Sequence, residues 1–251
     1  MNKPDQSDVV VVTGAGRGLG SDLAQKFAAN RYKVLVTDLD TSRIDETVEL
    51  IRTKGGVAEG GVLDVCKKSD FESTLAKALS LWGRADVLIN NAGMTRTTSL
   101  FDISPEEFSQ IVDVNMRGTF LGCQVFGKYF SEEGYGRIVN LASLAAQNGG
   151  AATGAHYAAS KGGIVTLTKV FARDLAKKGV TVNAISPGPL DVELVREILP
   201  PEKLEAVTQS IPVGRLGNPN FIADIALLMA SRSAASMTGS TVDCNGGLYV
   251  R

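Results

Sequence analysis

The sequence predicts a single doubly wound α/β domain, in which one parallel β-sheet carries helices on both faces. Short runs of β-branched residues alternate with longer amphipathic stretches along the chain, and this alternation is typical of a parallel sheet built from β–α units. A glycine-rich segment directly follows the first apolar run, as expected where a strand turns sharply into a helix. The 251 residues fit one such domain, so we expect residues 1–251 to form one unit.

Seven strands are expected from runs of valine, isoleucine and other apolar residues. Several of these runs are apolar at every position, as strands are when helices cover both faces of a parallel sheet. In chain order the expected strands are Val9–Val12, Val34–Thr37, Val57–Leu63, Val87–Ile89, Ile138–Leu141, Thr181–Ile185 and Ser240–Cys244.

Six helices are expected between these strands, because apolar side chains there recur at intervals of three or four residues. In the fifth helix, for example, Ile164, Leu167, Phe171 and Leu175 form one apolar stripe. In chain order the expected helices are Gly18–Asn30, Thr41–Lys54, Ser69–Trp82, Pro105–Ser131, Tyr157–Lys178 and Pro219–Ser231.

Overall composition excludes several classes of function. Lys and Arg total 26 against 27 Asp and Glu, a net charge of −1, so the chain lacks the basic excess with which nucleic-acid-binding proteins attract phosphates. The only histidine is His156, so no site with two or three histidine ligands is possible, and we expect no metal. A Ser-His-Asp hydrolase would need His156 itself, and the sequence contains no G-x-S-x-G motif.

Cysteine usage and hydropathy indicate a cytoplasmic protein. Cys66, Cys123 and Cys244 are odd in number and far apart, which favours free thiols in a reducing compartment. The N-terminus is polar, so no signal peptide is expected. The longest uncharged run, Ile138–Ser160, contains Asn, Gln and Ser side chains that would lack partners in lipid. We therefore expect no membrane association.

The glycine-rich segment has the form of a dinucleotide-binding turn. The first strand leads into Thr13-Gly14-Ala15-Gly16-Arg17-Gly18-Leu19-Gly20, which matches G-x-x-x-G-x-G and not G-x-G-x-x-G, since position 19 is leucine. In such a turn the glycines let the backbone bend, and the following helix directs its N–H groups toward a pyrophosphate. A P-loop is excluded because no Gly-Lys-Ser/Thr follows. The segment could also be a glycine-rich turn that binds no ligand, but the strand before it and the helix after it favour the dinucleotide-binding interpretation.

Two charged residues near this turn favour different cofactors. Asp38 ends the second expected strand, where a carboxylate accepts hydrogen bonds from the adenosine ribose of NAD and repels the 2′-phosphate of NADP. Arg17 could instead pair with that phosphate, and at ~4 Å and an effective dielectric of ~20 such a pair is worth about 4 kcal/mol before desolvation. Because Asp38 is held on a strand while Arg17 lies on a loop, NAD is predicted and NADP stays open.

A tyrosine and a lysine have the spacing of an acid/base pair. Tyr157 and Lys161 are four residues apart and therefore lie on one face of a helix, while Ser143 follows the fifth expected strand. A free tyrosine has a pKa of about 10. A neighbouring cation together with the positive nicotinamide of NAD⁺ is expected to lower that pKa and to produce a general base.

Taken together, these motifs resemble those of the short-chain dehydrogenase/reductase family, whose fold is a single Rossmann domain. The resemblance covers nearly the whole chain, and the ordered set of motifs is far more specific than any one of them. In order they are Thr13-Gly14-x-x-x-Gly18-x-Gly20, Asp64-Val65, Asn90-Asn91-Ala92-Gly93, Val114-Asn115, Ser143, Tyr157-x-x-x-Lys161, Pro187-Gly188 and Asn245-Gly246-Gly247.

The resemblance implies a role for each matching residue. Tyr157 is the expected acid/base, Ser143 is expected to hydrogen-bond the same substrate oxygen, and Lys161 is expected to lower the pKa of Tyr157 and bind the nicotinamide ribose. Asn115 is expected to hold a water molecule in the proton relay. The expected cofactor-binding residues are Gly14, Gly16, Arg17, Gly18, Leu19, Asp38, Asp64, Val65, Asn91, Ala92, Gly93, Tyr157, Lys161, Pro187, Gly188, Leu190 and Val192.

Within the family the chain looks most like 3-oxoacyl-carrier-protein reductases, especially in Gly214-Arg215-Leu216-Gly217 and in the ending Asn245–Tyr249. Three features depart from that pattern. Asp38 disfavours the NADP that those reductases usually use. The stretch Ser131-Glu132-Glu133-Gly134 is acidic, whereas the stretch that docks the acidic carrier is often basic in those reductases. Val192 stands where many relatives have a threonine. The Ser143–Tyr157 interval is also one residue longer.

The predicted function is hydride transfer between NAD(H) and a secondary alcohol or ketone, with no metal. The alternatives are an NADPH-dependent 3-oxoacyl-carrier-protein reductase and, in another class, a catalytically idle dinucleotide-binding sensor. An apolar stretch from Leu190 to Ile211 is expected to cover a small hydrophobic substrate, and His156 is expected to have a packing role. The resemblance also implies a homo-oligomer, with a tetramer expected before a dimer.

Overall fold

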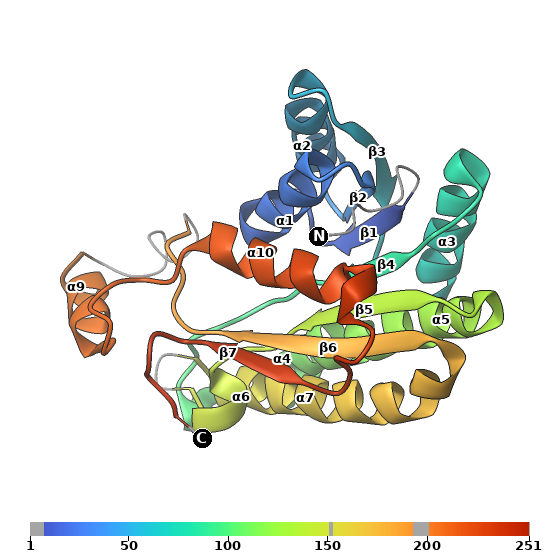
Figure 1. Cartoon of the computed structure of the whole chain (residues 1–251). Helices are drawn as coiled ribbons and strands as arrows, with labels where there is room; N and C mark the ends of the chain where they lie inside the picture. The colour runs from blue at the N-terminus through green and yellow to red at the C-terminus, as the bar shows by residue number, and fades with distance from the viewer. Residues whose placement is uncertain (1–7, 151–152, 193–200, 251) are drawn as a thin grey trace.

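The seven predicted strands form one sheet in the structure, a computed structural model that describes residues 8–150, 153–192 and 201–250. Neighbouring strands are parallel throughout, in the order β3-β2-β1-β4-β5-β6-β7 (Figure 1). Their bounds are β1 Val9–Thr13, β2 Lys33–Asp38, β3 Val57–Val62, β4 Val87–Asn90, β5 Gly136–Leu141, β6 Val180–Pro187 and β7 Thr241–Cys244. The predicted fold class is confirmed.

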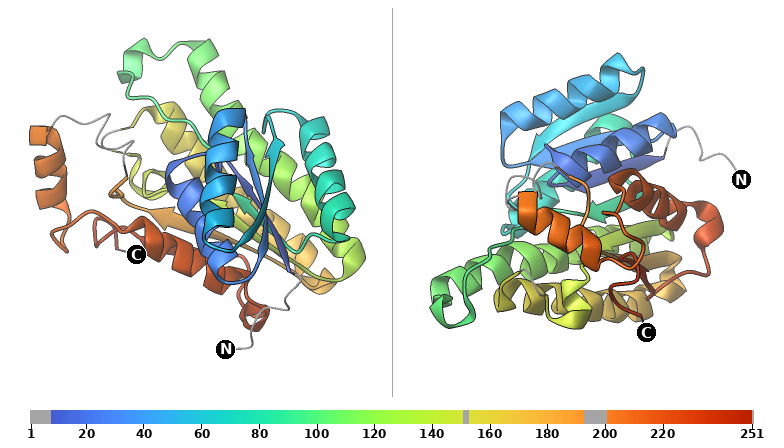
Figure 2. Two further views of the ribbon diagram at one scale, coloured as in Figure 1. Left: turned by 90° about the horizontal axis from the view of Figure 1, so that it is seen from above. Right: turned by 90° about the vertical axis from the view of Figure 1, so that its left-hand side faces the viewer.

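Helices cover both faces of the sheet, and each face has its own apolar core (Figures 1 and 2). Alternate residues of a strand point to opposite faces. Val10 and Val12 therefore pack on the side of α1 and α10, while Val9 and Val11 pack on the side of α3 and α5, which explains why β1 is apolar at every position. One face carries α1 Gly18–Ala29, α2 Thr41–Thr53 and α10 Pro219–Ala230, and the other carries α3 Lys68–Trp82, α5 Gly118–Glu133 and α7 Ala155–Leu175.

The predicted helix Pro105–Ser131 is divided in the structure. It comprises α4 (Pro105–Val112), a π-helical segment (Asp113–Arg117) and α5. A π-helical turn accommodates an extra residue and is typical of functional positions. Here the turn holds the buried Asn115, whose side chain bonds to the backbone of Met94 after β4. This long-range contact outweighs the regular helical pattern that the sequence shows.

Two helices were not predicted. The single-turn α6 (Ala145–Asn148) follows β5, and α9 (Pro201–Ser210) lies within the stretch from Leu190 to Ile211 that was expected to cover the substrate. Residues 193–200 of that stretch lie outside the described residues. The remaining short elements are the 3₁₀ turns η1 Leu100–Asp102, η3 Ala176–Lys178 and η4 Arg232–Ala234.

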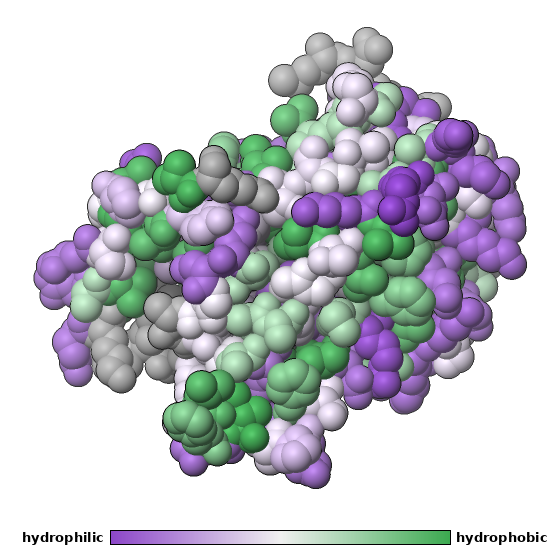
Figure 3. Space-filling view, turned by 90° about the horizontal axis from the view of Figure 1, so that it is seen from below, coloured by the Kyte–Doolittle hydropathy of each residue, from purple (hydrophilic) through white to green (hydrophobic). Residues whose placement is uncertain are grey.

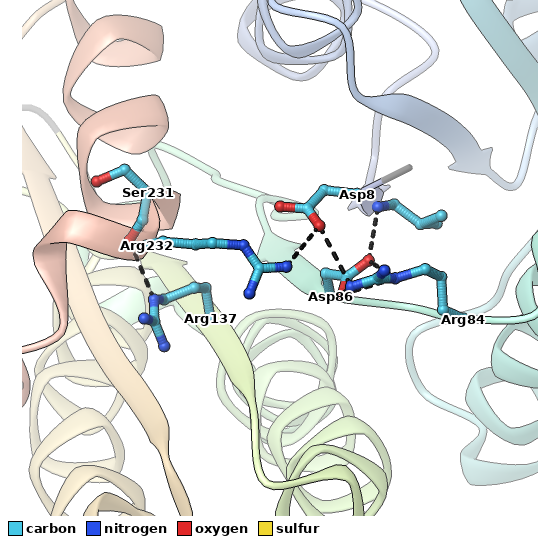
Figure 4. A network of polar contacts seen from close by, with 7 residues as sticks. Asp8, Arg84, Asp86, Arg137, Ser231 and Arg232 are labelled. Carbon is cyan, nitrogen blue, oxygen red and sulfur yellow. Dashed lines mark hydrogen bonds and ion pairs between the residues drawn. The ribbon is translucent and has the colours of Figure 1, made fainter. Parts of the chain in front are cut away.

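A network of buried charges closes the amino edge of the sheet (Figure 4). Asp86, just before β4, accepts hydrogen bonds from the amide of Val9 at 2.8 Å and from Nε of Arg84 at 2.9 Å. Asp8, just before β1, accepts from Nη2 of Arg232 at 2.9 Å and from Nη2 of Arg84 at 3.3 Å. These bonds join the beginning of β1 and β4 to η4, the short turn that precedes β7 in the chain.

An aromatic ring extends the same network on the β5 side. Arg137 donates from Nε to the carbonyl of Ser231 at 3.2 Å (Figure 4). The Tyr135 ring has the guanidinium carbon of Arg137 at 4.5 Å from its centroid and that of Arg232 at 4.4 Å. Such cation–π contacts hold the two arginines in place without an additional carboxylate.

Membrane and metal features were searched only in residues 8–150, 153–192 and 201–250. Within these ranges, none of the helices has both the length and the apolar character that a membrane crossing requires. The same ranges contain no group of three or more His, Cys, Asp or Glu side chains placed to hold a metal ion. Cys66, Cys123 and Cys244 are free thiols.

Candidate active site

The predicted site residues gather at the carboxyl edge of the sheet. Because the strands are parallel, the turn after β1, the segment after β4 and the loops after β5 and β6 all emerge at this edge. From β1 the chain passes outward to β2 and β3 and then returns to β4 on the other side of β1. Such a topological switch point is where doubly wound folds bind their ligands.

The glycine turn after β1 is held tightly against the end of β4. Asn91 donates from Nδ2 to the carbonyls of Thr13 and Gly14 at 2.9 and 3.0 Å. The hydroxyl of Thr13 accepts from the amides of Asn91 and Ala92, each at 3.0 Å. A Cβ on Gly14 would lie 2.7 Å from Cα of Ala92, so only glycine permits this approach.

The structure supports a fit between this turn and a dinucleotide. Gly18 begins α1 with φ +53°, and a Cβ built there would meet nothing within 4 Å. Glycine at this position is therefore explained by backbone conformation and not by packing within the protein. The start of α1 presents free N–H groups at a glycine-lined surface, which is the arrangement that holds a pyrophosphate. Gly14, Gly16, Gly18 and Leu19 are the residues that would surround it.

Asp38 lies at the end of β2 with its carboxylate directed at neighbouring amides. Oδ2 accepts from the amide of Gly16 at 3.1 Å, and Oδ1 accepts from the amides of Leu39 and Asp40 at 2.7 and 3.3 Å. These bonds fix a negative charge beside the glycine turn, as predicted. Arg17, in contrast, is an exposed side chain at the start of α1.

Asp64 and Val65 lie after β3, on the adenosine side of the predicted site. Asp64 accepts from the amide of Cys66 at 3.0 Å and lies 3.3 Å from Nζ of Lys67. The amide of Cys66 and the ammonium of Lys67 lower the pKa of the Asp64 carboxyl. Val65 is buried, and its contact with the adenine stays a prediction.

Three predicted catalytic groups meet between β5 and α7. Tyr157 and Lys161 lie in the first turns of α7, and Ser143 follows β5. Ser143 lies close enough to the Tyr157 hydroxyl to lower its pKa by hydrogen bonding, and Ser143 Oγ accepts from the amide of Ala145 at 3.2 Å. Nζ of Lys161 lies 5.6 Å from the centroid of the Tyr157 ring and donates to the carbonyl of Leu141 at 2.6 Å.

Burial shifts the two pKa values of this cluster in opposite directions. Burial raises the pKa of Tyr157, and the hydrogen-bonding effect of Ser143 opposes this rise. The lowering of the Tyr157 pKa by Lys161 together with the positive nicotinamide stays a prediction, because it concerns the protein with its dinucleotide bound. Burial in turn lowers the pKa of Lys161 to about 8, because a charge is costly to keep away from water.

Asn115, the fourth predicted catalytic residue, links the segment after β4 to α7. Its Oδ1 accepts from the amide of Met94 at 2.7 Å, and its Nδ2 donates to the carbonyl of Met94 at 2.9 Å and to Oγ of Ser160 at 3.0 Å. Both ends of the side-chain amide thus have protein partners. The backbone carbonyl of Asn115 accepts from the hydroxyl of Thr119 at 2.8 Å. The water-holding role implied by the resemblance remains a prediction.

The loop after β6 lies beside the same edge. Gly188 donates its amide to the carbonyl of Cys244 at 3.0 Å, and Leu190 forms an isolated parallel bridge with Gly217. Val192 is partly buried against the core on the α1 side. Pro187, Gly188, Leu190 and Val192 therefore lie on one loop at this edge, and their place beside the nicotinamide stays a prediction. No polar side chain of these four replaces the missing threonine.

Two contacts near the site were not predicted from the sequence. Glu107 of α4 pairs with the buried His156, directly before Tyr157, so His156 is a buried bridge between two helices. Gln147 of α6 donates to the carboxylate of Asp243 on β7. Neither pair has a spacing that a sequence pattern could reveal, because the partners are brought together only by the fold.

Comparisons with known proteins extend over nearly the whole chain. A family model described as Enoyl-(Acyl carrier protein) reductase matches residues 14–249. The chain is 36% identical over 250 residues to the short-chain reductase protein NovJ of Streptomyces niveus, which covers 96% of this chain and 94% of that protein. It is 34% identical over 245 residues to the 3-oxoacyl-[acyl-carrier-protein] reductase FabG of Vibrio cholerae, with 98% of each chain covered.

A solved structure agrees with these sequence matches. A variant of actinorhodin polyketide ketoreductase with NADPH has a TM-score of 0.92 and 30% identity to this chain, covering 97% of this chain and 98% of that one. The relatives named here are all reductases. The chain is accordingly an NAD(P)-dependent oxidoreductase acting on CH–OH groups and ketones, and it belongs to the short-chain dehydrogenase/reductase family.

Proposed function

We propose that the protein reduces the 3-keto group of an acyl thioester, with Tyr157 donating the proton to the carbonyl oxygen. The observation that carries this proposal is the meeting of the Ser143 and Tyr157 hydroxyls with the buried ammonium of Lys161, whose Nζ lies 5.6 Å from the centroid of the Tyr157 ring. The similarity to FabG and to a polyketide ketoreductase favours a 3-oxoacyl substrate over the broader class of secondary alcohols predicted first.

Each residue of the cluster has a separate task in this reaction. When bound, the dinucleotide supplies the hydride that forms the new C–H bond at the carbonyl carbon. The Ser143 hydroxyl hydrogen-bonds the carbonyl oxygen as negative charge develops on it, and the Tyr157 hydroxyl gives that oxygen its proton. Since the pKa of Lys161 is about 8, Lys161 is mostly protonated at pH 7 and can return a proton to the Tyr157 phenolate.

For the cofactor we propose NADH. Three amides fix the carboxylate of Asp38 beside the glycine turn, where it can accept from ribose hydroxyls and repel a 2′-phosphate. NADPH is the second candidate. It is favoured by the exposed side chain of Arg17 at the same turn and by the NADPH of the similar ketoreductase structure.

The thioester is proposed to be small, such as one of coenzyme A. The acidic stretch Ser131–Gly134 spans the end of α5, and Glu132 and Glu133 are exposed. Because α5 leads directly into the beginning of β5, this stretch lies at the amino edge of the sheet, opposite Tyr157. Its negative charges would repel an acidic carrier protein. A carrier bound at this edge would also lie far from Tyr157.

The decisive experiment compares both cofactors on one ketone. We expect 3-oxobutanoyl-coenzyme A to be reduced with a higher kcat/KM for NADH than for NADPH, followed by the absorbance of the reduced cofactor. Replacing Asp38 with alanine is expected to shift this ratio toward NADPH by at least about tenfold, because a repulsive charge near the phosphate is removed. A strong NADPH preference of the unmodified protein would contradict the cofactor proposal.

The same assay separates this proposal from two other functions. Turnover of simple secondary alcohols without turnover of the thioester would support the alcohol dehydrogenase predicted first. Tight binding of NADH without turnover of any alcohol or ketone in a broad panel would support a dinucleotide-binding sensor.

We also propose that the protein is a homo-oligomer. Large apolar side chains are exposed on the surface formed by η1, α4, α5 and α7, and this underside of the molecule shows extensive hydrophobic colour (Figure 3). The residues are Leu100, Phe101, Phe108, Phe120 and Val170, and a second exposed set on α10 and near the C-terminus comprises Phe221, Leu228 and Val250. Two separate apolar faces favour a tetramer, since a dimer covers only one. Sedimentation equilibrium tests this, and a monomer would contradict it.

A further inference from the structure

The only histidine of the chain lies directly under the candidate active site, and its two ring nitrogens have different partners. His156 is 0% exposed and occupies the first turn of α7 beside Tyr157. Its Nδ1 accepts the amide N–H of Tyr157 at 2.8 Å. Its Nε2 lies 2.8 Å from Oε1 of Glu107 on α4. The imidazole therefore connects two helices at the residue on which the proposed reaction depends.

These two contacts define the tautomer of the ring. A backbone N–H can only donate, so Nδ1 of His156 must carry a lone pair. The hydrogen of the neutral ring is then on Nε2, where it is donated to the Glu107 carboxylate. The Tyr157 amide also lies 3.0 Å from the carbonyl of Gly154, so this amide has two acceptors at the start of the helix.

The chain is shaped to accommodate the ring in this position. A Cβ built on Gly154 would lie 2.3 Å from Cε1 of His156 and 2.7 Å from its Nδ1. The φ of Gly154 is −67°, an ordinary value, so glycine is needed here for space and not for backbone conformation. The amide of Gly154 donates to the carbonyl of Arg96 at 3.0 Å, which ties the same turn to the segment after β4.

The carboxylate at the other end is itself fixed. The amide of Glu107 donates to Oγ of Ser104, the N-cap residue of α4, at 3.1 Å. Hydrogen bonds from Thr98 and His156 to the Glu107 side chain lower the pKa of this carboxyl, and the nearby charge of Arg96 acts in the same direction. Glu107 is thus an ionised acceptor held in place from two sides.

We propose that His156 and Glu107 are positioning residues for the proposed reduction, fixing the first turn of α7 against α4 so that Tyr157 faces Ser143. This inference rests on the proposed function. Tyr157 and Ser143 lie on different elements, so their hydroxyls meet at the substrate only if α7 keeps its place relative to the loop after β5. A displacement of ~1 Å at such a site can reduce a rate by about 100-fold.

A spectroscopic experiment tests the geometry without requiring activity. Because the natural chain has one histidine, protein prepared without a histidine tag and labelled with ¹⁵N gives imidazole signals from His156 alone. We expect an unprotonated Nδ1 and a protonated Nε2, together with slow hydrogen exchange of the Tyr157 amide. A ring protonated at Nδ1 would overturn the proposal.

Variants of Glu107 then test the consequence for catalysis. Glu107→Ala should lower kcat for 3-oxobutanoyl-coenzyme A by about tenfold or more, while the Kd for NADH stays unchanged and exchange of the Tyr157 amide becomes faster. Glu107→Gln keeps an acceptor oxygen for Nε2–H and should restore most of the lost kcat. The matched control is Glu106→Ala, which removes an exposed carboxylate from the same first turn of α4 and should leave kcat unchanged.

The outcomes separate the two proposals. If Glu107→Ala changes neither kcat nor the tautomer of His156, the positioning role is overturned. It is also overturned if Glu107→Gln loses as much kcat as Glu107→Ala, or if the control Glu106→Ala loses kcat. If the unmodified protein reduces no ketone, the proposed function fails. The tautomer and the exchange rate of the Tyr157 amide in the same variants then decide alone whether this link between the helices exists.

Discussion

The two edges of the sheet both bury charged groups, but in the described residues their partners differ: opposite charges at the amino edge and a backbone carbonyl at the carboxyl edge. At the amino edge Asp8 and Asp86 are 1% and 2% exposed, and both accept from arginine side chains. At the carboxyl edge Lys161 is 4% exposed and donates to a backbone carbonyl. In the described part of the chain no carboxylate forms an ion pair with it.

The pKa shifts show the consequence of this difference. Burial and the neighbouring carboxylate of Asp86 raise the pKa of Asp8, and the hydrogen bond and charge of Arg232 and the charge of Arg84 oppose part of this rise. At Lys161 burial is the only resolved cause, and it lowers the pKa to about 8. Paired charges hold the amino edge together, whereas an uncompensated charge at the carboxyl edge can gain or lose a proton near neutral pH.

The largest expected effect comes from removing one hydroxyl at the carboxyl edge. Tyr157→Phe should reduce kcat by about 1,000-fold, since general acid catalysis contributes roughly 10²–10⁴-fold, and the Kd for NADH should stay the same. Steady-state kinetics and a fluorescence titration of cofactor binding measure the two quantities. Substantial turnover by this variant would exclude Tyr157 as the proton donor.

At the amino edge the expected loss is one of stability. Asp86→Ala removes the acceptor of the Val9 amide and of Arg84. Arg84 keeps Asp8 as a partner, so the main cost is the buried amide left without an acceptor, about 1–3 kcal/mol. Urea unfolding should show the loss, while kcat per folded molecule stays unchanged. If kcat fell along with the stability, the two edges would not be independent.

A third prediction uses the uncompensated charge of Lys161. In the folded protein its pKa is about 8, below the ordinary lysine value of 10.5, so between these values the unfolded chain binds more protons and folding stability rises with pH. Relative to Lys161→Met, the unmodified protein should gain about 2 kcal/mol between pH 7.5 and 9.5. Urea unfolding across this range measures it, and the range ends below pH 10, where tyrosines of the unfolded chain ionise. Parallel pH profiles of the two proteins would show that Lys161 has an ordinary pKa.

The fold and much of the candidate site follow from local sequence patterns. The central strands could be predicted because a two-sided apolar sheet leaves continuous runs of residues such as Val9–Val12. The outer strands β3 and β7 contain Glu59 and Asp243 and are only partly buried, and they could be predicted from their place in the alternation of strands and helices. Ser143, Tyr157 and Lys161 could be predicted to meet because strand ends and helix starts converge at one edge of a parallel sheet. The π-helical turn at Asn115 could not, since its cause is a bond to Met94 on another segment.

The parts that sequence reasoning missed depend on long-range contacts and on depth of burial. Asp8 and Arg232 are 224 residues apart, and no spacing rule connects them. The interval between Tyr157 and Lys161 indicates proximity only. It reveals neither the carbonyl of Leu141 that attracts the ammonium nor the burial that raises the pKa of the phenol.

The smallest expected effect comes from making the same tyrosine change at the other edge. The hydroxyl of Tyr135 is buried and, among the described residues, has no hydrogen-bond partner, whereas its ring contacts Arg137 and Arg232. Tyr135→Phe keeps those ring contacts and removes an unsatisfied polar group, so the free energy of unfolding should rise by about 1 kcal/mol or stay the same. Urea unfolding and kcat, measured beside Tyr157→Phe, test this pair. A loss of stability above about 1 kcal/mol would show that the Tyr135 hydroxyl is satisfied, and a loss of kcat would show that the amino edge reaches the site.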